Sequence, residues 1–255
     1  MIELFPLKGF TIGGMNIVKK IVSKMANSLA SPTSVLSHPF TVAVEGNVGS
    51  GKTTFLNYFN KFDNVGVFAE PIDLWRNCNG YNLLDLMYKD PKKWSFTFQS
   101  YVQLTMLRQH QKKIHQPVKL MERSLYSARY CFVEKMSRDG LMAAPSVAVI
   151  DEWFKYITKF EDTKVDLIVY LKTSPEVAYE RILKRNRSEE RTVPFEYIQA
   201  LHDIHEDWLC RKTLHNCVAP VIILNADLDR SVIEEEYERF GPHILNKMPL
   251  QAEVL

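Results

Sequence analysis

From Phe40 onward, short apolar runs alternate with longer stretches of helical period. The apolar runs predict strands near 40–45, 65–69, 118–122, 165–171 and 219–224. The helical periods predict helices near 52–62, 94–115, 125–138, 147–161, 174–186, 195–210 and 230–240. This order is typical of repeated β-α-β units, whose right-handed crossovers place helices on both faces of a parallel sheet. The pattern therefore predicts an α/β fold with a five-stranded parallel sheet and a ligand site at the carboxyl ends of its strands.

The first 39 residues follow a different pattern. Apolar residues recur there at helical period from Met15 to Leu29, and residues 1–40 contain four lysines against one acid. A basic amphipathic segment is typical of mitochondrial targeting, but this one lacks the arginines that such segments usually carry. We therefore expect residues 1–39 to be either a flexible arm of a cytoplasmic protein or a mitochondrial address. The folded domain is predicted over 40–240, followed by a tail over 241–255.

The composition fits a folded globular chain, with 46% hydrophobic and 24% charged residues in 255. The net charge of +2 is concentrated in the first 40 residues, so the nearly neutral remainder disfavours a nucleic acid polymer as partner. No apolar run approaches the roughly 20 residues of a membrane-spanning helix, so we expect no membrane partner. The four cysteines form no CxxC pair, which predicts packing roles in a reducing compartment.

The most specific motif is a glycine-rich stretch that fits the P-loop pattern GxxxxGK[ST] and lies between a predicted strand and a predicted helix. Its backbone amides, the helix N-terminus and the charge of Lys52 suit the phosphates of a nucleotide, and the Thr53 hydroxyl suits Mg²⁺. The predicted nucleotide-binding residues are Gly46, Asn47, Val48, Gly49, Ser50, Gly51, Lys52, Thr53 and Thr54.

The P-loop alone leaves the phosphoryl acceptor open. A switch GTPase needs an Asn-Lys-x-Asp motif, which 246–249 does not match. A motor or regulatory ATPase needs an acidic pair after an apolar strand, and 147–152 resembles that pattern. The apolar positions from Val147 to Ile157 nevertheless recur at helical period, which favours a helix. A nucleoside-monophosphate kinase on the same scaffold is a further alternative.

Acidic residues and an arginine follow two of the predicted strands. Glu70 comes after the strand 65–69, and Glu122 and Arg123 come at the end of the strand 118–122. Because the carboxyl ends of parallel strands share one edge of the sheet with the P-loop, we expect these side chains to converge there. That is where a phosphoryl acceptor must bind.

An ordered set of motifs resembles the deoxynucleoside kinase family over about residues 38–240. The motifs are Glu45–Thr54, Glu70–Pro71, Met87–Pro91, Phe98–Tyr101, Glu122–Ser124 and Arg185–Glu190. Within the family, the sequence is most similar to the insect multisubstrate and mitochondrial thymidine kinase branches. The resemblance implies a P-loop kinase three-layer sandwich with an Arg-rich lid, and a homodimer. It also implies transfer of a phosphoryl group from ATP, with Mg²⁺, to the 5′-hydroxyl of deoxynucleosides in nucleotide salvage.

The resemblance further implies catalytic roles for Glu70, Arg123 and Lys52. Glu70 would be the general base for the 5′-hydroxyl, a step that a carboxylate within hydrogen-bond reach can perform. Arg123 would hold the 5′-oxygen and the incoming phosphoryl group, and Glu122 would join Thr53 around Mg²⁺. Phosphoryl transfer depends mostly on such positioning and charge neutralisation.

The same resemblance implies how the nucleoside and the ATP are bound. Gln99 would pair with the base, since an amide both donates and accepts hydrogen bonds. Around it, the predicted substrate contacts are Trp75, Met87, Phe98 and Phe132, the apolar far side Val102, Met106 and Ala128, and the sugar contacts Tyr88 and Glu190. Arg185 and Arg187 would close over the phosphates as a lid, and Asp227 lies in the loop expected to contact adenine. The apolar far side favours thymidine and deoxycytidine, with purine deoxynucleosides tolerated.

One further cluster imitates a metal site. His202, His205 and Glu206 recur at helical spacing, but no distant third ligand is apparent in the sequence. We expect this helix to be structural and do not predict zinc.

Overall fold

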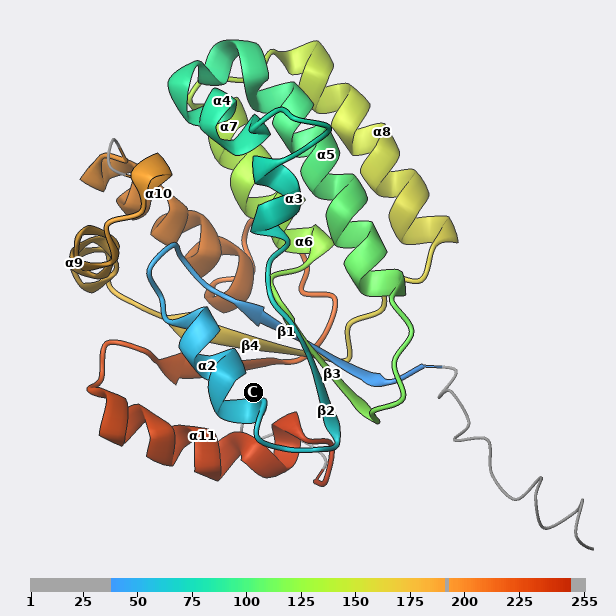
Figure 1. Cartoon of the computed structure of the whole chain (residues 1–255), viewed down its shortest axis with the longest axis vertical. Coiled ribbons are helices and arrows are strands. Elements are labelled where there is room, and N and C mark those ends of the chain that lie inside the picture. Colours follow the sequence, from blue (N-terminus) through green and yellow to red (C-terminus); the bar gives the residue numbers. More distant parts are fainter. Residues whose placement is uncertain (1–37, 191–192, 249–255) are drawn as a thin grey trace, which may run out of the picture. The chain divides into compact units, whose positions relative to one another are not determined.

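The computed structural model describes residues 38–190 and 193–248. Its strands form a parallel sheet (Figure 1), made of β1 (Phe40–Glu45), β2 (Val65–Phe68), β3 (Val118–Glu122), β4 (Leu167–Lys172) and β5 (Val221–Asn225). The strand order is β2-β3-β1-β4-β5, so β1 is central. β2 and β3 lie on one side of β1 and the later strands on the other, which opens a crevice at its carboxyl end. The predicted α/β fold with five parallel strands is confirmed.

The helical segments alternate with these strands along the chain. They are α2 (Lys52–Phe59), α3 (Ile72–Arg76), α4 (Leu83–Lys89), α5 (Pro91–Gln111), α6 (Leu125–Ser127), the π-helix η1 (Ala128–Val133), α7 (Glu134–Arg138), α8 (Ala144–Phe160), α9 (Pro175–Arg185), the 3₁₀-helix η2 (Ser188–Glu190), α10 (Phe195–His205), the π-helix η3 (Glu206–Cys210) and α11 (Arg230–Ile244).

One face of the sheet packs on α2 and α11. Successive side chains of a strand point to opposite faces, and Val42 and Val44 of β1 point to this one. Phe55 of α2 meets Tyr237 of α11 there, with ring centroids 4.9 Å apart. Figure 1 shows the two helices on the same side of the strands. This packing holds the N-terminus of α2 at the edge of the sheet where β1 ends.

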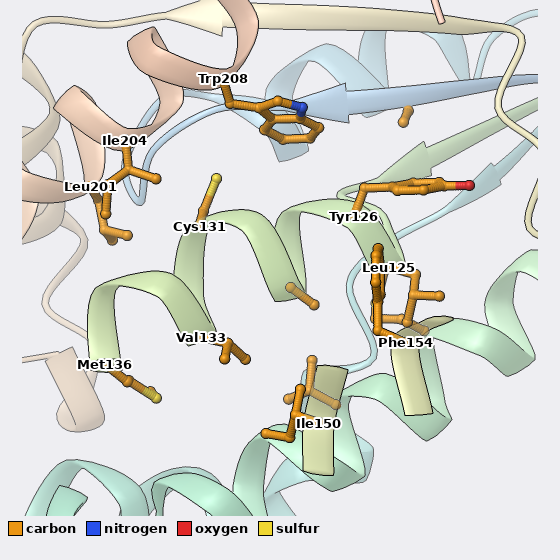
Figure 2. Packing of buried hydrophobic residues seen from close by; sticks show 14 of the residues in the cluster. Leu125, Tyr126, Cys131, Val133, Met136, Ile150, Phe154, Leu201, Ile204 and Trp208 are labelled. Atoms are coloured by element: carbon orange, nitrogen blue, oxygen red, sulfur yellow. The ribbon is translucent and has the colours of Figure 1, made fainter. Parts of the chain in front are cut away.

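The opposite face carries a larger core that joins α5, η1, α8 and α10. Figure 2 shows this packing around η1 and α7, where Cys131 lies on the side of Trp208 of η3 and Val133 on the side of Ile150 of α8. Trp208 is completely buried. Helices therefore cover both faces of the sheet, as the three-layer arrangement requires.

Several predicted helices differ from the observed ones in detail. The helix predicted over 94–115 is α5, which begins at Pro91 after the N-cap Asp90 and ends at Gln111. The single helices predicted over 125–138 and 195–210 each contain a π-helical segment, η1 and η3. The short helices α3 and α4 were not predicted, because neither is long enough to show a helical period.

The segment 147–152 lies within helix α8, as its period predicts, so the strand that a motor ATPase would need there is absent. The predicted apolar stripe from Met15 to Leu29 lies outside the described residues. The division into arm, domain and tail stays a prediction. Among the described residues, no helix has both the length and the apolar character needed to cross a membrane.

Candidate active site

The P-loop connects β1 to α2 and is shaped by three glycines with positive φ. Gly46, Gly49 and Gly51 have φ of 146°, 81° and 89°, backbone angles that residues with a side chain rarely adopt. A Cβ on Gly49 would also collide with the carbonyl oxygen of Ala178 in α9. The Asn47 side chain donates to the carbonyl of Ile198 in α10, 2.8 Å away. The loop is thus fixed to the helices around it.

The cationic and hydroxyl groups of the loop lie next to Glu122. The Lys52 ammonium donates to the Asn47 carbonyl at 2.7 Å and the Gly46 carbonyl at 3.2 Å. Burial, followed by the nearby charge of Arg123, lowers the pKa of Lys52 to about 7. The Thr53 hydroxyl donates to a carboxylate oxygen of Glu122 at 3.3 Å. The two residues predicted to ligate Mg²⁺ therefore lie side by side, and their oxygens are the hard donors that this ion prefers.

A cavity of about 290 Å³ opens beside the loop. All the predicted substrate-binding residues line it, namely Glu70, Trp75, Met87, Tyr88, Phe98, Gln99, Val102, Met106, Arg123, Ala128, Phe132 and Glu190. Val48, Gly49, Lys52, Thr53 and Glu122 line its phosphate side, and Arg185 and Arg187 also reach it. Residues far apart in the sequence, from Val48 of the P-loop to Glu190 of η2, are thus brought to one site.

On the wall of the cavity, Glu70 forms an ion pair with Arg123. The Arg123 Nε and the Glu70 Oε1 are 2.9 Å apart, and the two side chains are 6% and 15% exposed. Burial raises the pKa of Glu70, and the charge of Arg123 opposes that rise. Arg123 has a positive φ of 62°, a strained conformation of the kind that clusters at functional sites. Its guanidinium also lies over the ring of Phe132, 4.5 Å from the centroid.

The far end of the cavity combines aromatic walls with one buried amide. Trp75 and Phe98 meet edge to face, with centroids 5.7 Å apart, and the Trp75 indole donates to the Thr105 hydroxyl at 2.8 Å. Gln99 is 1% exposed. Its buried Oε1 has no hydrogen-bond partner in the described part of the chain. An unsatisfied buried amide beside a cavity suits a ligand that offers a donor there.

Glu190, which also lines the cavity, forms ion pairs with the two arginines predicted to act as a lid. Arg185 Nη2 lies 2.6 Å from Glu190 Oε2, and Arg187 Nη1 lies 3.5 Å from Oε1. Tyr88 is partly buried, and its pKa is raised, chiefly by removal of the side chain from water, so its hydroxyl stays protonated. It can therefore donate a hydrogen bond at neutral pH.

Some predicted residues lie apart from the cavity. Asp227 follows β5, and its carboxylate accepts a hydrogen bond from the Ser174 amide at 2.8 Å. Gly46, Asn47, Ser50, Gly51 and Thr54 build the P-loop without lining the cavity. The adenine contact of Asp227 stays a prediction.

The structure adds cavity residues that the sequence reasoning missed. They include Ile72, Leu84, Met136, Tyr197, Arg76 and Glu189. Arg76 and Glu189 join α3 to η2 through an Nε–Oε1 contact of 2.7 Å. Tyr197 was detectable only as part of a helix, because its direction depends on how α10 packs.

The histidine cluster and the cysteines have structural partners. His205 donates from Nδ1 to the Leu201 carbonyl at 2.6 Å, and Glu206 accepts from Tyr170 at 2.9 Å and from Lys172 at 2.7 Å. Within 38–190 and 193–248, no group of three His, Cys, Asp or Glu is placed to hold a metal ion. The four cysteines are free thiols, and Cys131 is packed in the core.

A P-loop that shares a cavity with a buried carboxylate–arginine pair is typical of the site of a small-molecule kinase. The comparisons with known proteins identify the kind. The family model of deoxynucleoside kinases matches residues 42–248, and the chain belongs to this family. The enzyme is therefore a phosphotransferase that phosphorylates deoxynucleosides in nucleotide salvage, with ATP as the donor.

Three relatives illustrate the range of the family. Human mitochondrial thymidine kinase 2 is 46% identical over 204 residues, covering 80% of this chain and 77% of the relative. Human deoxycytidine kinase is 32% identical over 225 residues, covering 77% and 86%. The mitochondrial deoxyguanosine kinase of Xenopus laevis is 33% identical over 216 residues, covering 74% and 82%.

Proposed function

We propose that Glu70 is the general base that takes the proton of the nucleoside 5′-hydroxyl while Arg123 holds the 5′-oxygen and the transferring phosphoryl group. The observation that supports this is the Glu70–Arg123 pair, 2.9 Å apart on the cavity wall beside the P-loop. A carboxylate whose pKa is raised by burial is a stronger base than a solvated one, and the neighbouring charge of Arg123 favours its ionised form. Glu70 therefore meets both requirements of a base at neutral pH.

Charge on the phosphates is balanced by groups that line the same cavity. Lys52 belongs to the P-loop, and Arg185 and Arg187 approach from the end of α9. Thr53 and Glu122 would hold Mg²⁺, because a hydroxyl and a carboxylate 3.3 Å apart form a suitable pair of oxygen donors. The bound ion would neutralise phosphate charge. Fixed charges of this kind provide most of the catalysis in phosphoryl transfer.

The walls of the cavity suit a pyrimidine deoxynucleoside. Gln99 can pair with the base edge, since its buried Oε1 is unsatisfied, and aromatic side chains flank it. The far side carries Met106 and Ala128, both apolar and buried, which leaves room for the methyl group of thymine. Two relatives are named for thymidine and deoxycytidine, which agrees with this choice. We infer that thymidine and deoxycytidine are the main substrates and that purine deoxynucleosides are tolerated.

Tyr88 and Glu190 would bind the 3′-hydroxyl. A protonated phenol and a carboxylate offer one donor and one acceptor to a hydroxyl group. A nucleoside-monophosphate kinase would instead need cations at this place for the phosphate of its acceptor, whereas Tyr88 and Glu190 are a phenol and a carboxylate. An unphosphorylated sugar fits this environment better.

A product assay tests these assignments together. The purified enzyme is incubated with Mg·ATP and each of the four natural deoxynucleosides, and the products are identified by chromatography against 5′- and 3′-monophosphate standards. We expect 5′-monophosphates, with the highest kcat/KM for thymidine and deoxycytidine. 3′-Deoxythymidine lacks the 3′-hydroxyl, so its kcat/KM should be about tenfold or more lower than that of thymidine, because Glu190 would have no sugar hydroxyl to bind. Formation of 3′-monophosphate, or no product from any deoxynucleoside, would refute the proposal.

We also infer that the enzyme is a homodimer whose interface includes α8. Val149, Trp153, Tyr156 and Phe160 are 46%, 60%, 53% and 62% exposed, and their spacing places them along one face of the helix. A row of exposed aromatic residues is typical of an interface. A contact between two copies of the chain is favoured, because these four side chains carry no charge and one apolar surface can pack against the same surface of a second copy. The double variant Trp153→Glu with Phe160→Glu should elute as a monomer in light-scattering chromatography. A dimer in that variant would place the interface elsewhere.

The predicted arm over 1–39 bears on localisation. Its four lysines and apolar stripe suit an import signal, and two of the relatives are named as mitochondrial. We infer a mitochondrial location rather than a cytoplasmic one. Fusion of residues 1–39 to a fluorescent protein tests this inference. We expect mitochondrial fluorescence, whereas cytoplasmic fluorescence would favour the alternative of a flexible arm.

A further inference from the structure

Glu45 is a completely buried carboxylate that no part of the mechanism above uses. It is the last residue of β1 and directly precedes the P-loop. Its Oε1 accepts a hydrogen bond from the Ser124 hydroxyl at 2.5 Å. Its Oε2 is buried and has no hydrogen-bond partner among residues 38–190 and 193–248. Burial of a carboxylate is costly, so its presence at this place calls for a compensating role.

The register of the sheet places Glu45 beside Arg123. Val44 of β1 pairs with Glu122 of β3, so the next residues of the two strands, Glu45 and Arg123, are neighbours. The Arg123 amide donates to the Val44 carbonyl at 2.9 Å, which fixes this relation beyond the end of the strand. Burial raises the pKa of Glu45 to about 7, and the Ser124 and Ser127 hydroxyls and then the charge of Arg123 act in the opposite direction. The two groups therefore interact electrostatically.

Arg123 needs such support more than an ordinary arginine does. Its backbone is in the left-handed region with φ of 62°, and its side chain is only 6% exposed. The buried Nη1 has no hydrogen-bond partner within the described residues. The Glu70 pair holds the guanidinium from the β2 side of β3, and Glu45 lies at the end of β1, the neighbouring strand on the other side of β3.

We propose that Glu45 is a positioning residue that holds Arg123 and Ser124 in place at the end of β3, so that the guanidinium is aimed at the nucleoside 5′-oxygen. Glu45 does not line the cavity and touches no substrate. It acts through Arg123, and the inference therefore rests on the function proposed for that residue. Without Glu45, the strained backbone at Arg123 is free to relax and the guanidinium shifts away from the reacting oxygen.

The test is a double-mutant cycle on the full-length enzyme with thymidine and Mg·ATP. Glu45→Ala removes the carboxylate, and Glu45→Gln keeps its shape and an oxygen for Ser124. Arg123→Lys keeps the charge but changes its geometry. Glu206→Ala is the matched control, because Glu206 is also a buried carboxylate but is paired with Tyr170 and Lys172 away from the cavity.

We expect Glu45→Ala to lower kcat about tenfold or more while the KM for thymidine stays within about threefold, since small misplacements of catalytic groups are costly. Glu45→Gln should recover part of the loss. In the Arg123→Lys background, Glu45→Ala should cost less than about threefold, because the group that it positions has already been altered. Glu206→Ala should lower the melting temperature and leave kcat within about threefold.

Equal losses from Glu45→Ala in both backgrounds would overturn the inference, and so would Glu45 variants with kcat near the wild-type value. If Glu45→Ala does not fold, Glu45→Gln is carried through the same cycle. If the single variant Arg123→Lys kept the wild-type kcat, the function proposed for Arg123 would itself be overturned. The two failures are therefore distinguishable.

Discussion

Replacing Glu70 with glutamine is the most direct test of the chemistry. The change removes the charge and the basicity of the side chain but keeps its size and one oxygen for Arg123, which lies 2.9 Å away. General-base catalysis contributes about 10²- to 10⁴-fold, which corresponds to about 2.7–5.5 kcal/mol in the activation free energy. Turnover of the Glu70→Gln enzyme should fall by this amount.

Binding of the nucleoside should change far less than turnover. A hydrogen bond to a carboxylate is worth about 1 kcal/mol more than one to a neutral amide, which is about fivefold in Kd. Glu70→Gln should therefore lower turnover at least about tenfold more than it weakens nucleoside binding. Glu189→Gln is a suitable control, since Glu189 lines the same cavity and pairs with Arg76 at 2.7 Å but is not assigned a role in proton transfer.

The assay combines rapid-quench measurement of phosphoryl transfer from radiolabelled ATP with calorimetric titration of thymidine. Burial raises the pKa of Glu70, and the base must be ionised, so wild-type kcat/KM should decline on the acid side as pH falls through that raised pKa. The Glu70→Gln enzyme should lack this decline. Turnover within about fivefold of wild type, or an unchanged acid limb, would refute the assignment of Glu70 as the base.

Three further predictions concern the pocket, the P-loop and the core. Met106→Arg with Ala128→Asp places charge on the apolar far side and should lower the kcat/KM ratio of thymidine to deoxycytidine; an unchanged ratio would contradict the pocket assignment. Gly51→Ala should lower the free energy of urea unfolding by about 1 kcal/mol, because φ is positive there but the space around the residue is open. Gly49→Ala should lower it by at least twice as much, because its Cβ would collide with α9. Equal losses for the two variants would contradict this explanation. Burial lowers the pKa of His110 to about 4 from 6.5. The folded protein therefore keeps its full stability from the neutral, buried His110 above pH 6.5 and loses it as the pH falls towards 4. Between pH 8 and pH 5 the wild type should lose about 2 kcal/mol more unfolding free energy than His110→Gln, and parallel losses would show that the histidine titrates normally.

The sheet and the phosphate loop could be predicted because both have strong local signals. Buried parallel strands are continuous apolar runs, and the P-loop motif fixes its own backbone through glycine. The short helices α3 and α4 have no such signal, although the Asn82 side chain caps α4 by accepting from the Asp85 amide at 3.0 Å. The π-helix η1, which carries the cavity residues Ala128 and Phe132, depends on tertiary packing around Cys131. Its extra residue per turn changes side-chain directions in a way that no helical period reveals.

The identity of the site residues came from their motifs, whereas their mutual geometry comes from strand register. Phe68 of β2 pairs with Met121 of β3, so two residues further along Glu70 comes opposite Arg123. Val44 of β1 pairs with Glu122, so Glu45 comes next to Arg123 from the other side. Three adjacent strands thus deliver a row of carboxylate, guanidinium and carboxylate at the edge of the sheet. A slip of one residue in either pairing would send these side chains to opposite faces. The apolar pattern that buries Val42, Val44 and Leu120 prevents that slip, so the same side chains that make the core also set the distance between Glu70 and Arg123.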